Sequence, residues 1–139
     1  MTRGYRFFDH TADFGIEIFG DDARSLYEEA AKALFDLIAG SGTIVRGHQR
    51  KLEVSGEDWA DLMVNWLREL LYIWNGESQL VRRVEMLTLK KTLLQAMVTS
   101  EEYDPECHEI RNEIKAVTYH QIEAGPFEDG WRARVVLDI

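Results

Sequence analysis

Two stretches of this sequence repeat apolar residues at helical spacing, and they interrupt a run of segments that alternate like β-strands. The first stretch, residues 21–39, begins with two aspartates and is followed by Gly40, a pattern typical of a helix. The second carries apolar residues from Trp59 to Trp74, with a candidate capping box of Ser55 and Asp58 before it. Each stretch predicts an amphipathic helix.

The predicted strands are mostly neighbours along the chain, joined by short turns. Two helices that interrupt a run of such strands favour the α+β class, with a mainly antiparallel sheet and both helices on one face. A chain of 139 residues with 45% hydrophobic residues can bury one ordinary core, so residues 1–139 are predicted to form a single domain. The predicted strands cover residues 5–8, 15–19, 49–54, 81–89, 93–100, 116–122 and 131–137.

Charge and hydropathy exclude several classes of partner. The formal net charge of −9 repels phosphate backbones, so unaided binding to RNA or DNA is disfavoured and a basic protein partner is favoured. No apolar run approaches the ~18 residues that a membrane helix needs, and the first ten residues lack a signal-like apolar stretch, so we expect a cytoplasmic protein without a membrane partner. Cys107, the single cysteine, cannot form an internal disulfide or a thiolate zinc cluster.

Motifs of several common chemistries are absent from the sequence. It contains no phosphate loop of the Gly-x-x-x-x-Gly-Lys type, no Gly-x-Gly-x-x-Gly, no Gly-x-Ser-x-Gly and no His-Glu-x-x-His. Nucleotide binding and serine or zinc hydrolysis therefore lose their usual sequence support.

Carboxylates near predicted strand ends are candidate ligands for a cation. Asp13 closes a His-Thr-Ala-Asp tetrapeptide between the first two predicted strands, a position that polar turns commonly occupy. Alternation along residues 131–139 places Asp138 at a strand end, beside the α-carboxylate of Ile139. Adjacent anions repel unless a positive group lies near them, and carboxylate oxygens suit calcium or magnesium.

Two further polar residues come from the strand predicted before the last one. If these two strands pair as a hairpin, Lys115 falls opposite the end formed by Asp138 and Ile139. Lys115 is then either a salt-bridge partner of the carboxylates or a cation that contacts phosphate near a metal. His120, on the same predicted strand, is open to the same two interpretations, although a lone histidine in a strand is more often structural than a ligand or base.

The same residues carry a resemblance to a known family. It lies in five segments that follow one another in order and span the chain. These segments are His10-Thr11-Ala12-Asp13 with Gly15, Trp66-Leu67-Arg68-Glu69-Leu70-Leu71-Tyr72, Asp104-Pro105 with His108-Glu109, Glu113-Ile114-Lys115-Ala116-Val117-Thr118-Tyr119-His120, and Val135-Val136-Leu137-Asp138-Ile139. Together they resemble the archease family, and Phe14 and Arg68 are small departures from its pattern.

The resemblance implies a function in RNA processing. It implies a cytosolic protein, not itself an enzyme, that activates an RtcB-type RNA ligase by promoting its guanylylation and multiple turnover in tRNA splicing or RNA repair. Such a protein meets RNA only through the ligase. The resemblance also implies a metal site of Asp13, Asp138 and the Ile139 carboxylate, with calcium as the ion, and we add Lys115, His120 and His10 as candidate contacts for activation or phosphate.

Two functions of other classes stay open at this point. A metal-dependent phosphoesterase would use Asp13 and Asp138 as ligands, with His120 or His10 as general base or acid. A chaperone-like binding module would need a sizeable exposed apolar patch. Activity of the purified protein alone would favour the phosphoesterase, whereas activity only in a mixture with the ligase would favour the activator.

Overall fold

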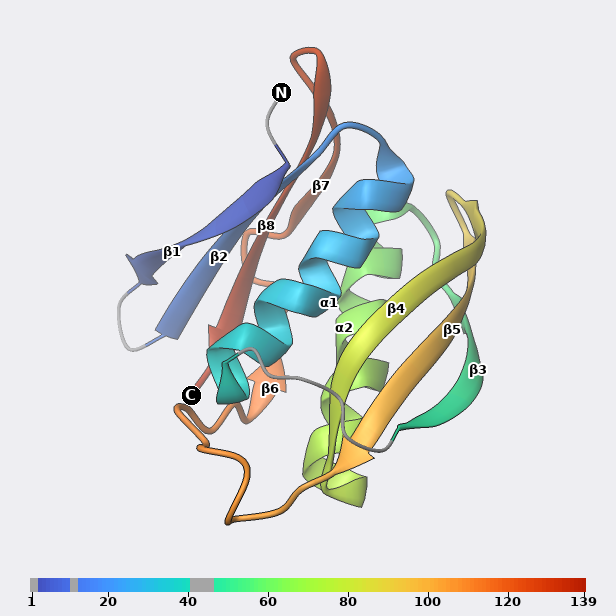
Figure 1. The fold of residues 1–139 in the computed structure, drawn as a ribbon. Helices are drawn as coiled ribbons and strands as arrows, with labels where there is room; N and C mark the ends of the chain where they lie inside the picture. The colour runs from blue at the N-terminus through green and yellow to red at the C-terminus, as the bar shows by residue number, and fades with distance from the viewer. Residues whose placement is uncertain (1–2, 11–12, 41–46) are drawn as a thin grey trace.

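The computed structural model describes residues 3–10, 13–40 and 47–139, and of Asp9 and His10 it describes the backbone only. Figure 1 shows that these residues form two sheets with two helices between them. The elements are β1 Gly4–His10, β2 Asp13–Gly20, α1 Ala23–Ala39, β3 His48–Ser55, α2 Trp59–Glu77, β4 Gln79–Lys90, β5 Leu93–Glu102, β6 Ala116–Val117, β7 Glu123–Phe127 and β8 Gly130–Asp138.

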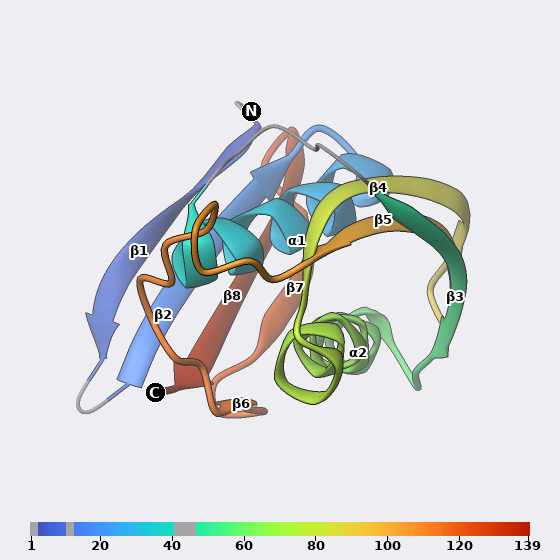
Figure 2. The ribbon, with the colours of Figure 1, turned by 60° about the horizontal axis from the view of Figure 1, so that its bottom comes forward.

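Both sheets are antiparallel. The five-stranded sheet has the order β1-β2-β8-β6, with β7 also paired to β8, and the three-stranded sheet has the order β3-β5-β4. Figure 2 shows α1 between the two sheets and α2 inside the curve of the three-stranded sheet, and both helices contact strands of both sheets. The predicted α+β class is confirmed, with the strands divided between two sheets.

Side-chain caps fix where the helices begin. The Asp22 side chain accepts a hydrogen bond from the Ser25 backbone N–H at 2.8 Å, and the Ser25 hydroxyl accepts one from the Asp22 N–H at 3.1 Å. In α2 the cap is Asp58, which accepts a hydrogen bond from the Asp61 N–H at 2.8 Å. The predicted pairing of Ser55 with Asp58 is therefore wrong, because Ser55 is the last residue of β3.

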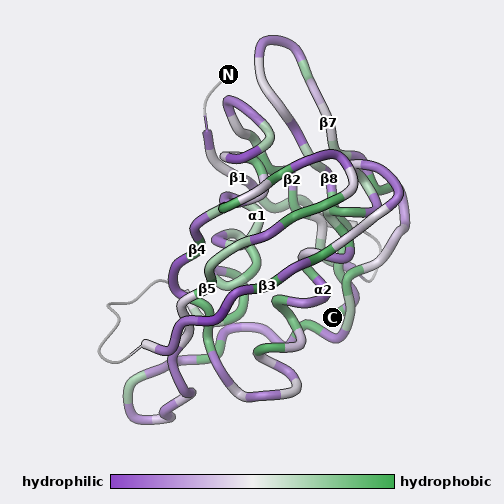
Figure 3. The backbone as a smooth tube through the Cα atoms, turned by 90° about the vertical axis from the view of Figure 1, so that its right-hand side faces the viewer, coloured by the Kyte–Doolittle hydropathy of each residue, from purple (hydrophilic) through white to green (hydrophobic). Residues whose placement is uncertain are grey.

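The core fills the space between the two sheets. Strand residues alternate between this core and the outer faces, which Figure 3 shows as alternating hydropathy along β3, β4 and β5. Trp66 of α2 is fully buried, and its Nε1 donates a hydrogen bond to the carbonyl of Tyr27 in α1 at 3.0 Å. Trp59 packs edge-on against Trp131 of β8 at 5.0 Å between ring centroids. Trp66 is thus a core residue whose burial contributes about 2 kcal/mol or more, whereas Trp59 and Trp131 are partly buried and pack against the core.

The region before the last strand differs most from the prediction. The chain leaves the sheet after Val117, and the Thr118 hydroxyl donates a hydrogen bond to the Val136 carbonyl at 2.8 Å. Gln121 then takes a positive φ of 53°, which ends any extended run. The predicted strand 116–122 is thus only two residues long, and β7 is a separate strand.

Candidate functional site

Strands β2 and β8 bring two carboxylates face to face. Asp13, the first residue of β2, is the register partner of Asp138, the last residue of β8. Side chains at directly opposed positions lie about 5 Å apart at Cβ, where like charges destabilise the pair. The Asp138 side chain is exposed and Asp13 is partly buried. Ile139 follows directly and is 42% exposed.

The segment before β6 lies beside this end of β8. The Lys115 backbone N–H donates a hydrogen bond to the Asp138 carbonyl at 2.7 Å, and Ala116 is the register partner of Asp138. From α2, Asn75 Nδ2 donates to the Ile114 carbonyl at 3.0 Å, which holds the segment against the helix. The exposed Lys115 thus lies where the hairpin argument expected it, whereas its contact with phosphate stays a prediction.

The two candidate histidines are placed differently. His120 lies outside β6, in an exposed turn where its backbone N–H donates to the Thr118 hydroxyl at 3.2 Å. The interpretation that placed it on one strand with Lys115 is therefore wrong. His10 is the backbone register partner of Asp13, and its side chain lies outside the described residues, as do Thr11 and Ala12.

The donors at this end fit a hard cation. Carboxylate and carbonyl oxygens are the ligands that calcium and magnesium prefer, and Asp13 and Asp138 supply two negative charges at one sheet edge. Within residues 3–10, 13–40 and 47–139, no group of three His, Cys, Asp or Glu side chains is placed to hold a metal. A third protein ligand among these residues would then be an oxygen of another kind, from a hydroxyl or amide side chain or from the main chain.

A polar cluster on α2 braces this end, and the sequence did not predict it. Arg68 Nε donates to the Val117 carbonyl at 3.1 Å, and the Arg68 guanidinium carbon lies 4.6 Å from the Tyr119 ring centroid. The Tyr119 hydroxyl donates to Asp61 at 2.7 Å. This hydrogen bond raises the pKa of Tyr119 and lowers the pKa of Asp61. Arg68 thus ties α2 to β6.

A second, buried cluster fixes the segment that leads to Lys115. Glu101 near the end of β5 is bonded to Arg82 Nε at 3.2 Å and to His108 Nε2 at 2.5 Å, and all three side chains are at most 10% exposed. The other ring nitrogen of His108 accepts the Asp104 N–H at 2.8 Å. Burial alone would raise the pKa of Glu101, but the bonds from His108 and Arg82 outweigh it and leave the pKa below its ordinary value.

Comparison with known proteins identifies the family. The model of the Archease protein family matches residues 5–139. The chain belongs to the archease family. The archease of Pyrococcus abyssi is 40% identical over 136 residues, with 95% of this chain and 96% of the relative covered. The archease of Methanosarcina acetivorans is 33% identical, with 97% and 95% covered.

Solved structures share the archease fold seen here. The solution structure of protein 1598 from Methanobacterium thermoautotrophicum has a TM-score of 0.80 at 33% identity, covering 99% of this chain and all of the other. The crystal structure of an archease from Thermotoga maritima has a TM-score of 0.63 at 23% identity, covering 95% of this chain and 94% of the other. At that identity the second likeness concerns the fold alone. Within the described residues, no helix combines the length and apolar character needed to cross a membrane.

Proposed function

We propose that this archease-family chain is a cytoplasmic protein activator of an RtcB-type RNA ligase, acting in tRNA splicing or RNA repair and not as an enzyme by itself. The ligase is the direct partner, and RNA is met only through it. The observation that carries the proposal is the register pair of Asp13 and Asp138, with the Lys115 backbone bonded to Asp138 at 2.7 Å. Two carboxylates and a lysine at one exposed sheet end suit contact with a metal and a nucleotide phosphate on a partner.

In this proposal Asp13, Asp138 and the Ile139 carboxylate hold a divalent cation, most suitably calcium. The bound cation supplies positive charge that a phosphate group can approach. The chain's own part is to present oxygen ligands at a rigid strand end and to aim Lys115 at the same place. The register of β8 with β2 and β6 provides that rigidity.

Activation requires unequal affinity for the states of the ligase. The protein must bind the state ready for guanylylation better than the others, because equal affinity for all states shifts no equilibrium. A net charge of −9 favours a basic surface on that partner and opposes independent capture of RNA. State-selective binding of the ligase and a charge that opposes RNA binding are both properties of an accessory factor.

A chaperone-like module is the second candidate, because the Thermotoga maritima relative is described as a possible chaperone. A general chaperone binds unfolded chains through a large contiguous apolar surface. The large hydrophobic side chains that are exposed in the described part come from five separate segments: Phe7, Tyr72, Leu87, Tyr119 and Ile139. Nothing in the described part joins these five side chains into one apolar patch, and the chaperone hypothesis would need such a patch.

The decisive measurement is guanylylation of the cognate ligase with radiolabelled GTP, with this protein at substoichiometric ratio. We expect labelled ligase and multiple rounds of RNA joining only in the mixture. Asp138→Asn should abolish the stimulation, and Lys115→Ala should weaken it. Glu106→Gln is the matched control, since it removes one exposed carboxylate from a loop outside the site.

Each alternative has its own signature in the same preparation. Hydrolysis of p-nitrophenyl phosphate by the protein alone would favour the phosphoesterase. Suppression of the heat aggregation of an unrelated protein, with no effect on guanylylation, would favour the chaperone. Full stimulation by Asp138→Asn would place the functional site elsewhere.

A further inference from the structure

A groove separate from the carboxylate end lies between α1 and the edge strand β4. It has a volume of about 290 Å³, and its walls are the helix residues 28–36 and the strand residues 81–84, with Arg3 beside them. Strand β4 is an edge strand, because the order of its sheet is β3-β5-β4. Nothing that this chain is proposed to do at Asp13 and Asp138 uses this groove.

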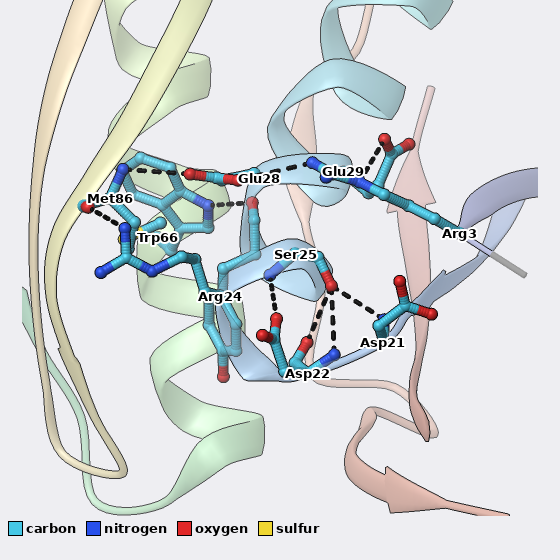
Figure 4. Close-up of polar contacts among 10 residues, drawn as sticks. Arg3, Asp21, Asp22, Arg24, Ser25, Glu28, Glu29, Trp66 and Met86 are labelled. Carbon is cyan, nitrogen blue, oxygen red and sulfur yellow. Dashed lines mark hydrogen bonds and ion pairs between the residues drawn. The ribbon is translucent and has the colours of Figure 1, made fainter. Parts of the chain in front are cut away.

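At one end of the groove, α1 side chains take the place of a neighbouring strand. Figure 4 shows Arg24 and Glu28 reaching Met86 of β4 from the helix. Arg24 donates a hydrogen bond to the Met86 carbonyl at 2.7 Å, and Glu28 accepts one from the Met86 N–H at 3.1 Å. A paired strand would supply the same donor and acceptor, so these two side chains satisfy the backbone N–H and C=O of Met86 in place of a neighbouring strand.

The next outward-facing pair of backbone groups on β4 belongs to Val84 and faces the groove. In an antiparallel sheet, alternate residues turn their N–H and C=O groups to the same side, and the register from Val84 to Met86 is regular. Val84 therefore presents both backbone groups on the side where Met86 meets α1, and it lines the groove. Among the described residues, no side chain or loop backbone bonds to Val84 on that side.

The groove has the size of a short extended peptide. From Glu28 to Asp36 the helix advances about 12 Å at 1.5 Å per residue, which is the length of three to four residues of a strand. Ala31, Phe35 and Val81 give its floor apolar side chains, which suits alternate side chains of a strand. A helix on one side and a strand edge on the other is the arrangement used for peptides that add a strand to a sheet.

The charges of the groove select the peptide. Its carboxylates already have partners: Glu28 is bonded to Met86 and Arg3, Glu29 to Arg3 at 2.9 Å, and Asp36 to the Tyr5 hydroxyl. Arg82 is likewise bonded, to Glu101 and to the Gly40 carbonyl.

Two cations of the groove stand apart from these pairs. Lys32 on the helix and Arg83 on the strand are exposed, and neither forms a hydrogen bond or ion pair with another described residue. A carboxylate on the incoming chain would meet these two donors. We propose that this groove binds an extended segment of a partner protein that carries an acidic side chain, adding it as a strand to the Val84 edge of β4.

The test uses the full chain and a defined probe, the peptide Ac-Thr-Val-Glu-Val-Thr-NH2. In a ¹⁵N-labelled sample we expect saturable shifts of the Val84, Lys32 and Arg83 amides. A counterpart peptide with Lys in place of Glu, and one with N-methyl groups on both valines, should each bind at least about fivefold more weakly, a cost near 1 kcal/mol for a lost ion pair or hydrogen bond.

A charge-reversed protein supplies the matched comparison. Lys32→Glu with Arg83→Glu should weaken binding about tenfold or more, whereas Lys51→Glu with Lys90→Glu has the same net charge on exposed positions outside the groove and should bind like the wild type. Four results would each overturn the proposal. They are no shift at about 1 mM peptide, shifts confined to other strands, equal binding of the N-methylated peptide, and equal weakening by both double variants.

Discussion

Carboxylates lie near the ends of two strands, and their surroundings differ in burial and in bonding. Glu101, near the end of β5, is 7% exposed and is bonded to Arg82 and His108 within the molecule. Asp138, at the end of β8, is exposed and is placed opposite another carboxylate, Asp13. The first arrangement compensates the charge of Glu101 within the molecule and stabilises the fold, while the second places two carboxylates opposite each other, as the proposed cation site requires.

The largest effect on stability is expected at Glu101. Glu101→Ala leaves the guanidinium of Arg82, which is 6% exposed, without its carboxylate, and it leaves His108 without its acceptor. Breaking one partner of a buried pair costs about 3–5 kcal/mol. Urea unfolding measures this loss. Glu102→Ala is the control, because the neighbouring side chain is exposed and should change the free energy of unfolding by about 0.5 kcal/mol or less. Equal losses of unfolding free energy in both variants would show that the Glu101 cluster does not stabilise the fold more than an exposed side chain does.

At the other strand end, the effect should depend on calcium. Asp138→Asn removes one of two opposed carboxylates, so without metal the free energy of unfolding should rise slightly, by less than about 1 kcal/mol. With calcium at 100 times the dissociation constant, the wild type should gain about 2.7 kcal/mol that EDTA removes. The variant should lose most of this gain, as followed by thermal unfolding with and without calcium. An undiminished gain in Asp138→Asn, compared with Glu106→Gln, would exclude Asp138 as a ligand.

Acid should weaken the Glu101 cluster in a predictable direction. Because the folded state lowers the pKa of Glu101, its contribution is complete above the ordinary glutamate pKa of about 4.3 and is lost as pH falls through the folded pKa. Wild type should therefore lose more stability than Glu101→Gln between about pH 5 and pH 3. Asp22 and Glu77 also have lowered pKa values and remain in both proteins, so the difference between the two pH profiles belongs to Glu101. Parallel profiles would contradict this assignment.

Local sequence patterns predicted the helices and most strands. The features that were not predicted depend on pairing between residues far apart in the sequence. The helices begin within two residues of the predicted starts or on them, because apolar periodicity and acidic caps are local. Strand β7 was missed because Gly125 and Pro126 argue against a strand, although proline is tolerated at an edge. The division into two sheets depends on pairs such as Asp13 with Asp138, which no local pattern specifies.

The sequence predicted the site residues whose positions depend on strand ends. It did not predict the contacts that depend on how a helix is oriented. Alternation placed Asp138 at a strand end, and the assumed pairing of the last two predicted strands placed Lys115 near it; the register of β6 and β8 agrees with both positions. His120 was misplaced because the turn after Val117 depends on the Thr118 hydroxyl, whose bond to the sheet has no sequence signature. The contacts of Arg68 require knowledge of how α2 faces β6.

The smallest effect on stability should come from Tyr119, whose hydrogen bond to Asp61 lies on the surface, unlike the buried contacts of Glu101. Tyr119→Phe removes the hydroxyl that donates to Asp61 at 2.7 Å. Tyr119 is exposed and Asp61 is partly buried, but the hydrogen bond itself is exposed, so water can replace it. The melting temperature should therefore shift no more than in Tyr72→Phe, where an exposed tyrosine loses the same atom.

The pKa of Asp61 should nevertheless move upward in Tyr119→Phe, because the hydrogen bond from Tyr119 is the main cause of its lowered value. It should stay below the ordinary value, since the Glu57 backbone N–H still donates to Asp61 at 2.8 Å. An NMR titration of the Asp61 carboxyl carbon measures this shift, and Tyr72→Phe should leave that titration unchanged. A drop in melting temperature comparable to that of Glu101→Ala would mean that the brace between α2 and β6 stabilises the fold as a buried cluster does.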